Sequence, residues 1–155
     1  MFASGLGQVF VVRVAGNVAA PEGIASLEFA VAALKVPLIV IMGHEGCGAV
    51  AGTLASVREC RATGKAPSAP SENLLRLQDH IRPSVEWALD SFADQDEAKI
   101  LREATERNVS HSVQTLLRES DIIRNAVEEG TLNIVCSEYF LADGAVQELD
   151  VPESR

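Results

Sequence analysis

The sequence has few cysteines, few aromatic residues and no long apolar run. Of its 155 residues, three are cysteine and 5% are aromatic, whereas 47% are hydrophobic and 23% are charged. No apolar stretch approaches the ~20 residues that span a bilayer, so no membrane association is expected. The hydrophobic content suffices for a single globular domain, residues 1–155, with a core of its own.

Clustered positive charge is also lacking. The chain has 13 Lys and Arg residues against 22 Asp and Glu residues, a net charge of -9, and the basic residues form no run or stripe. An electrostatic grip on a nucleic acid backbone needs such a stripe, so nucleic acid is not an expected partner. Small molecules or other proteins are the expected partners.

The first residues carry no export signal, since they have neither the basic segment nor the long apolar segment of a signal peptide. We therefore expect a cytoplasmic protein. Cys47, Cys60 and Cys136 are then expected to be free thiols rather than a disulfide framework. At least one of them is available for chemistry.

The hydrophobic pattern predicts an α/β fold, with a mainly parallel β-sheet and flanking helices. Residues 9–14 and 36–42 are apolar runs typical of strands, and an apolar stripe at helical spacing, on Ile24, Leu27, Val31 and Leu34, lies between them. This order is a βαβ unit. Its crossover should be right-handed, and its functional crevice should lie at the carboxyl ends of the strands.

Helices are predicted over most of the following segment, and a strand pair ends the chain. We expect helices at about 48–61, 74–88, 94–119 and 122–127, with a kink or a new helix at Pro83 and a loop at 62–71. Residues 132–141 are predicted to form a strand, 142–144 a hairpin turn, and 145–149 a short final strand.

A His-x-x-Cys motif, His44 and Cys47, lies between the second predicted strand and a helix start. On the spacing alone, two ordinary loop residues are the commoner explanation. Imidazole nitrogen and thiolate sulfur are ligands that zinc prefers, however, and a spacing of three lets both reach one ion. The helix N-terminus would also favour a thiolate at Cys47 and attract anions without any metal, so a thiol enzyme is the alternative.

Two related loops are excluded by single positions. A cysteine phosphatase loop needs an arginine six residues after its cysteine, and that position is Thr53. A phosphate-binding P-loop needs Gly-Lys-Ser/Thr, which this loop does not have.

Three segments resemble the β-class carbonic anhydrases in order and spacing: residues 11–17 (VVRVAGN), 26–30 (SLEFA) and 43–50 (GHEGCGAV). The resemblance continues through Asn108, Leu116 and the Asp-Gly hairpin, so it covers essentially the whole chain. It implies a zinc ion held by two cysteines and one histidine, with His44 and Cys47 as two of these ligands. It also implies a lyase in which zinc activates a water that attacks carbon dioxide to give bicarbonate, the role that zinc has in the unrelated three-histidine class.

The first zinc ligand of that family lies in a Cys-x-Asp-Ser-Arg segment, and the sequence contains no such segment. Because a stable zinc site normally has at least three protein ligands, we expect an impaired site unless a third ligand comes from elsewhere. Cys136 is the candidate within the chain, although a small buried strand residue is its commoner role. Cys60, Glu45 and a partner subunit are weaker candidates.

The same absence affects the expected sheet. In the family, the first strand lies between the strands that match residues 9–14 and 36–42. Without it, we expect these two strands to pair directly; the alternative is that they leave unpaired edges. Uncovered edges, together with the dimeric build of the family, favour a homodimer or higher homo-oligomer. A non-catalytic dimerising or anion-binding member of the family is the alternative function.

Other polar residues have mainly structural explanations. Arg13 and Asn17 end the first predicted strand, where they could belong to a site or could form an ion pair or cap that fixes the turn. His80, His111 and Trp87 are predicted to be structural residues of helices.

Overall fold

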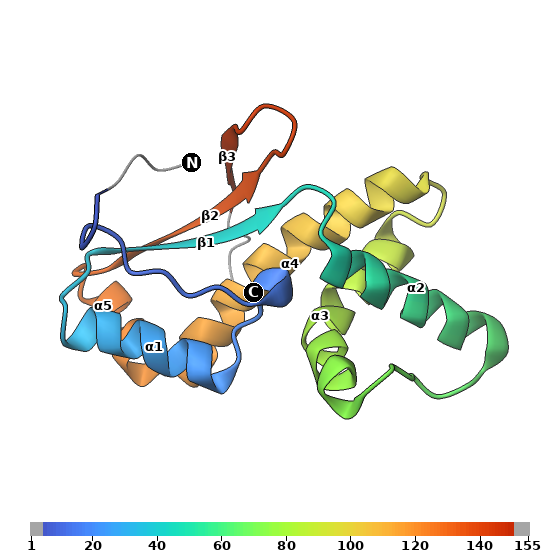
Figure 1. The fold of residues 1–155 in the computed structure, drawn as a ribbon, viewed down its shortest axis with the longest axis horizontal. Helices are drawn as coiled ribbons and strands as arrows, with labels where there is room; N and C mark the ends of the chain where they lie inside the picture. Colours follow the sequence, from blue (N-terminus) through green and yellow to red (C-terminus); the bar gives the residue numbers. More distant parts are fainter. Residues whose placement is uncertain (1–4, 151–155) are drawn as a thin grey trace.

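A small sheet and a set of helices account for residues 5–150, the part of the chain that this computed structural model describes. The elements are, in order, η1 (Ala15–Asn17), α1 (Pro21–Ala32), β1 (Leu38–His44), α2 (Gly48–Thr63), α3 (Glu72–Ser91), α4 (Glu97–Glu119), α5 (Asp121–Glu128), β2 (Asn133–Tyr139) and β3 (Val146–Leu149). Figure 1 shows the sheet with α1 and α5 at one end of the molecule and α2 with α3 at the other. None of the helices in this range has the length and apolar composition needed to cross a membrane.

The strands form one sheet in the order β1-β2-β3. β1 and β2 are parallel, in a register that runs from Leu38 opposite Asn133 to His44 opposite Tyr139. β2 and β3 are antiparallel and are joined at the predicted turn. The predicted α/β class is therefore confirmed, and so is the placement of the strand at 132–141 beside the strand at 36–42.

Residues 9–14 correct one prediction, because they form no strand and do not pair with β1. No backbone hydrogen bond joins this extended segment to any other part of residues 5–150. Instead its side chains lie along α1: the Phe10 ring is 6.5 Å from the Phe29 ring, and Val12 lies beside Gly23. Packing on α1 holds the segment away from β1. The alternative of unpaired edges is thus the correct one.

α4 contributes to three hydrophobic clusters, of which two are large. One lies between α2, α3 and α4 and includes Val50, Ile81 and Val85, all fully buried. The other joins α1, α4 and α5 to one face of the sheet through Ile24, Ile39, Leu116 and Ile123. The apolar helix faces predicted from the spacing are thus buried in these clusters. α4 connects the two ends of the molecule (Figure 1).

α3 excludes one of the two alternatives predicted at Pro83. It runs from Glu72 to Ser91 as one helix with Pro83 inside it, so no new helix starts there. Proline removes a helix hydrogen bond. The neighbouring Ile81, Ser84 and Val85 are buried against α2 and α4, and this packing offsets the loss.

Candidate metal centre

The His-x-x-Cys loop lies where the sequence predicts it, between the carboxyl end of β1 and the start of α2. His44 is the last residue of β1, and Cys47 is the N-cap of α2. The carbonyl of Cys47 accepts the amide hydrogen of Ala51 at 2.9 Å, the first bond of the helix. Gly46 has a φ of +63°, a left-handed conformation that glycine adopts without strain.

The exposed His44 ring has one nitrogen engaged and one free. Its Nδ1 lies 2.9 Å from the carbonyl oxygen of Glu45. A carbonyl oxygen can only accept, so Nδ1 is the donor of this bond, and the tautomer that it favours has the lone pair on Nε2. Metal-ligating histidines usually donate their second ring N–H in this way. This bond therefore leaves Nε2 as the nitrogen on the unengaged side of the ring.

Cys47 has a different environment from its partner in the motif. Its side chain is 3% exposed and belongs to the cluster that includes Val18 and Val50. The thiol thus lies at the apolar side of the loop, while the imidazole lies at the solvent side.

Cys136, the candidate for a third ligand within the chain, has the buried strand position that was given as its commoner role. Cys136 is fully buried on β2 opposite Ile41 and packs against Val109 and Val113. Burial raises the pKa of its thiol to about 11, which disfavours a thiolate at this position.

The donor atoms of the loop are of the kinds that zinc binds, but there are too few of them for a usual zinc site. Imidazole nitrogen and cysteine sulfur are its preferred ligands. Nevertheless, no three His, Cys, Asp or Glu side chains within residues 5–150 are grouped so as to hold a metal ion. Cys60 lies half-buried near the end of α2, and Glu45, although adjacent in sequence, completes no such group. The described chain therefore supplies two ligands of the motif and no third.

The end of β1 is fixed against α4 by very close packing. A Cβ atom at Gly43 would lie 2.7 Å from Cγ2 of Val109 and 3.5 Å from Cγ2 of Thr105. Only glycine fits this approach, which sets the position of His44, the next residue, relative to α4.

Asn17 has a structural role here and lies outside the His-x-x-Cys loop, residues 44–47, which is the candidate metal loop. Its carbonyl oxygen accepts a hydrogen bond of 2.9 Å from the Ser112 hydroxyl, and its Nδ2 donates to the Ser112 hydroxyl oxygen at 3.2 Å. The buried Asn108 side chain donates to the Gly16 carbonyl at 2.6 Å. These bonds attach η1 to α4. Arg13 is exposed and pairs with no acid in the described part of the chain.

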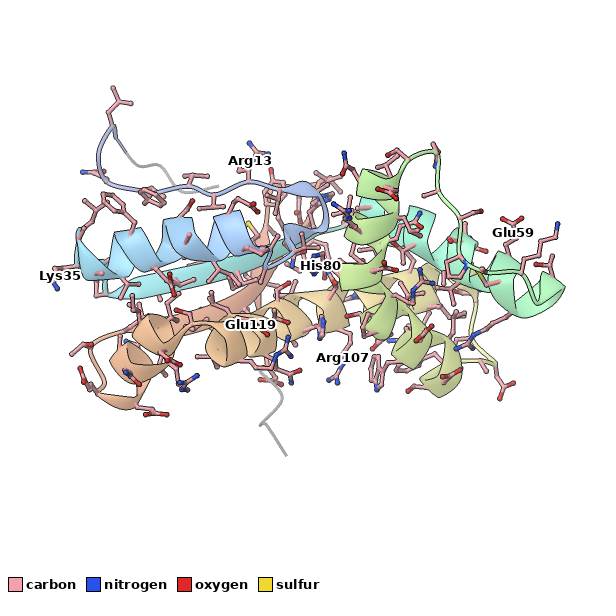
Figure 2. All side chains as sticks on the ribbon, turned by 90° about the horizontal axis from the view of Figure 1, so that it is seen from below. Arg13, Lys35, Glu59, His80, Arg107 and Glu119 are labelled. Carbon is pink, nitrogen blue, oxygen red and sulfur yellow. The ribbon has the colours of Figure 1, made fainter. Side chains whose placement is uncertain are left out.

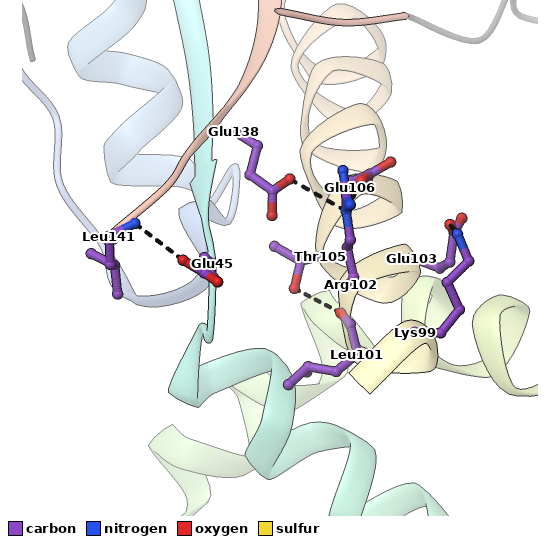
Figure 3. A network of polar contacts seen from close by, with 9 residues as sticks. All are labelled: Glu45, Lys99, Leu101, Arg102, Glu103, Thr105, Glu106, Glu138 and Leu141. Atoms are coloured by element: carbon purple, nitrogen blue, oxygen red, sulfur yellow. Dashed lines mark hydrogen bonds and ion pairs between the residues drawn. The ribbon is translucent and has the colours of Figure 1, made fainter. Parts of the chain in front are cut away.

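Sequence reasoning missed Glu138, which lies opposite Gly43 on β2. Its side chain is 2% exposed, and its Oε2 accepts no hydrogen bond within residues 5–150; Nε of Arg102 is 3.9 Å away (Figure 3). Burial raises the pKa of this carboxyl, Glu106 raises it further, and Arg102 opposes the shift. Its place near the carboxyl end of a parallel strand was the one signal that could have identified it.

We expect Glu138→Gln to stabilise the protein at neutral pH by about 1 kcal/mol, because it removes an incompletely paired buried charge. A raised pKa means that the folded chain binds this proton more tightly than the unfolded chain does. Stability of the parent should therefore fall as the pH rises from the ordinary carboxyl range through the folded pKa of Glu138. The stability gain of Glu138→Gln should vanish at pH values below the ordinary pKa range of a carboxyl group.

Urea unfolding of both proteins from pH 4 to 8 measures this difference. Glu59→Gln, at the exposed Glu59 of α2 (Figure 2), is the control and should leave the pH profile unchanged. A constant difference between parent and Glu138→Gln at every pH would contradict the prediction.

His80, His111 and Trp87 lie on α3 and α4, as predicted for structural residues (Figure 2 labels His80). Burial lowers the pKa of His111, as do the nearby cations Arg118 and Arg107. Trp87 packs at 5.6 Å on Phe92, and Arg107 lies 5.1 Å from its ring. A recess of about 450 Å³ beside this tryptophan is lined by α4 and β3 residues and includes no residue of the metal loop.

Comparisons with known proteins match nearly the whole chain to one family. The sequence model of the carbonic anhydrase family matches residues 1–146. A carbonic anhydrase of Mycolicibacterium smegmatis is 38% identical over 95% of this chain, and carbonic anhydrase 2 of Mycobacterium tuberculosis is 35% identical over 93%. The chain spans 66% and 64% of the length of these two relatives.

Solved structures that resemble this chain are also carbonic anhydrases, of the β class. A β-carbonic anhydrase of Aspergillus fumigatus has a TM-score of 0.80 at 26% identity, over 96% of this chain and 67% of the other. One of two β-carbonic anhydrases of Sordaria macrospora, described as tetrameric, has a TM-score of 0.75 at 27% identity, over 94% and 70%.

Proposed function

The chain belongs to the β-class carbonic anhydrase family, and from this premise we propose that it acts in the zinc-dependent, reversible hydration of carbon dioxide to bicarbonate. We assign His44 and Cys47 as two of the zinc ligands. The observation that carries this assignment is the hydrogen bond from His44 Nδ1 to the Glu45 carbonyl, which leaves Nε2 free to bind a metal.

Each residue of the loop has a defined part in this proposal. When bound, zinc supplies a Lewis acid that activates a water molecule at neutral pH. His44 contributes a neutral nitrogen ligand whose tautomer is set by Glu45, and Cys47 contributes a sulfur ligand at the N-terminus of α2, where a negative charge is favoured. Gly43 keeps this end of β1 against α4.

We further propose that this chain by itself binds zinc weakly and hydrates carbon dioxide well below the rate of a relative with the full ligand set. Two ligands rarely hold zinc tightly. The Cys-x-Asp-Ser-Arg segment that the family uses for its first ligand does not occur in the sequence given. Within residues 5–150 no third donor is grouped with His44 and Cys47, so a third ligand would come from outside this range.

A homodimer or higher oligomer in the cytoplasm is part of the same proposal. The outer edge of β1 pairs with no strand in residues 5–150, and several large apolar side chains of residues 9–14, α1 and β1 are more than 40% exposed, among them Val9, Val11, Phe29 and Leu38. Apolar surface of this kind favours association with another chain. Light scattering of the purified protein measures the oligomeric state.

Metal analysis combined with a carbon dioxide hydration assay tests the proposed function. We expect less than one tightly bound zinc per chain and slow hydration. His44→Ala and Cys47→Ala should each weaken zinc binding by more than tenfold, since each removes one of two ligands, whereas Cys60→Ala should not change it.

Two outcomes would contradict this proposal. Zinc binding that is unaffected by both His44→Ala and Cys47→Ala would remove the assigned site. Stoichiometric zinc with rapid hydration would show that the site is complete. Bicarbonate binding without zinc and without hydration would instead favour the non-catalytic, anion-binding alternative, for which the incomplete ligand group is the supporting observation.

A further inference from the structure

We propose that Glu45 is a positioning residue that sets the orientation of the His44 imidazole by attaching the metal loop to the end of β2. The inference rests on the proposed function in one respect, since it takes His44 to be a metal ligand. It concerns the residue that lies between the two halves of the motif and has no ligand role of its own.

Glu45 makes three hydrogen bonds with different groups. Its carbonyl oxygen accepts from His44 Nδ1 at 2.9 Å, its amide donates to the Tyr139 carbonyl at 2.9 Å, and its Oε2 accepts from the Leu141 amide at 3.2 Å. The first bond fixes the ring of His44. The other two fix the peptide that makes the first bond, so the side chain of Glu45 acts on His44 through its own backbone.

The loop needs such an attachment because the surrounding residues leave its backbone free to move. Gly46 and Gly48 flank Cys47, and no residue in 5–150 would contact a Cβ atom at either glycine within 4 Å. Glu45 itself is exposed, so packing does not hold it. A carboxylate that accepts a backbone N–H forms one of the stronger kinds of hydrogen bond, which suits it to this purpose.

The other end of the attachment lies beside a contact with α4. Leu141 follows Phe140, whose ring lies 5.8 Å from the guanidinium of Arg102, and Arg102 donates to Glu106 on the same helix at 2.8 Å. Figure 3 shows Glu45 and Leu141 at the left, and Arg102 with Glu106 on α4 to the right. The chain of contacts therefore runs from α4 through the start of the β2–β3 hairpin to the metal loop.

Cobalt binding to the full chain tests the inference with a readout other than activity. Co²⁺ is titrated into the parent, Glu45→Ala and Glu45→Gln, and the cysteine-to-cobalt absorption is followed. We expect Glu45→Ala to weaken Co²⁺ binding by tenfold or more, the range for loss of a group that orients a metal ligand. Glu45→Gln keeps an acceptor oxygen and should recover most of the affinity.

A matched control removes the same kind of bond elsewhere. Asp96 accepts the Lys99 amide at 2.8 Å at the N-terminus of α4, so Asp96→Ala loses an exposed carboxylate–amide bond far along the chain from the loop. It should leave Co²⁺ affinity unchanged. Metal-free hydrogen exchange gives a second measurement, in which the Leu141 amide should exchange about tenfold faster in Glu45→Ala than in the parent.

The results separate the inference from the proposed function. If the parent binds no Co²⁺, the assignment of His44 and Cys47 fails, and the exchange of Leu141 still tests the attachment. If the parent binds Co²⁺ and Glu45→Ala binds it equally well, Glu45 has no positioning role, although the metal site stands. Equal losses in Glu45→Ala and Glu45→Gln would also overturn the inference, because they would show that charge rather than the hydrogen bond matters.

Discussion

Gly16→Ala is expected to lower the free energy of unfolding by about 3 kcal/mol, because two separate costs add at this position. Gly16 has a φ of +64°, and a non-glycine residue in the left-handed region costs about 1 kcal/mol. A Cβ atom there would also lie 2.6 Å from Cδ1 of the fully buried Ile81 and 3.3 Å from Cβ of Ala49. Overpacking of a tight core typically costs about 1–3 kcal/mol.

Urea unfolding followed by circular dichroism measures the loss, and two further variants separate its parts. Gly64→Ala changes a glycine with a φ of +70° that has nothing within 4 Å of its Cβ position, so it should show the conformational cost alone. Ile81→Val removes Cδ1 and should relieve the steric part when combined with Gly16→Ala. A loss at Gly16 no larger than the loss at Gly64 would show that η1 is not tightly packed against α3.

Gly43→Ala should destabilise the protein by about 2 kcal/mol, by a purely steric route. Its Cβ would lie 2.7 Å from Val109, which is fully buried in α4. A valine in a helix has essentially one side-chain rotamer, so it cannot turn away, and either β1 or α4 must shift. Because His44 follows directly, the shift should also displace the first residue of the metal loop.

The double variant with Val109→Ala provides the test. Val109→Ala alone leaves a cavity and should cost about 2 kcal/mol. Once it has removed the obstructing methyl group, Gly43→Ala should cost little more, so the two changes should be clearly non-additive. Additive losses would mean that Gly43 and Val109 do not limit each other's space.

The sequence predicted the elements that depend on local pattern. Apolar spacing indicated α1 and α4, and the buried run before Gly43 indicated a strand that ends in the His-x-x-Cys loop. The placement of Cys136 beside that strand was also correct. These features follow from the periodicities of helices and strands, which a single sequence carries.

Features that depend on distant neighbours could not be predicted. Residues 9–14 have the composition of a strand, but a strand exists only if another edge is within reach, and contacts with α1 keep this segment away from β1. The burial of Glu138 depends on α4 and β3, which approach it from other parts of the chain. The orientation of His44 depends on Glu45, whose hydrogen bond to Leu141 spans 96 residues.

The position of α4 has a consequence for how the chain folds. This helix contacts η1, α2, α3, α5, β1 and β2, elements that come from both halves of the sequence. Neither half can complete its own packing before α4 has formed, so the rate-limiting step of folding should require this helix together with the segments it joins. Substitutions in the middle of α4 should therefore slow folding, whereas those in the hairpin after β2 should mainly accelerate unfolding.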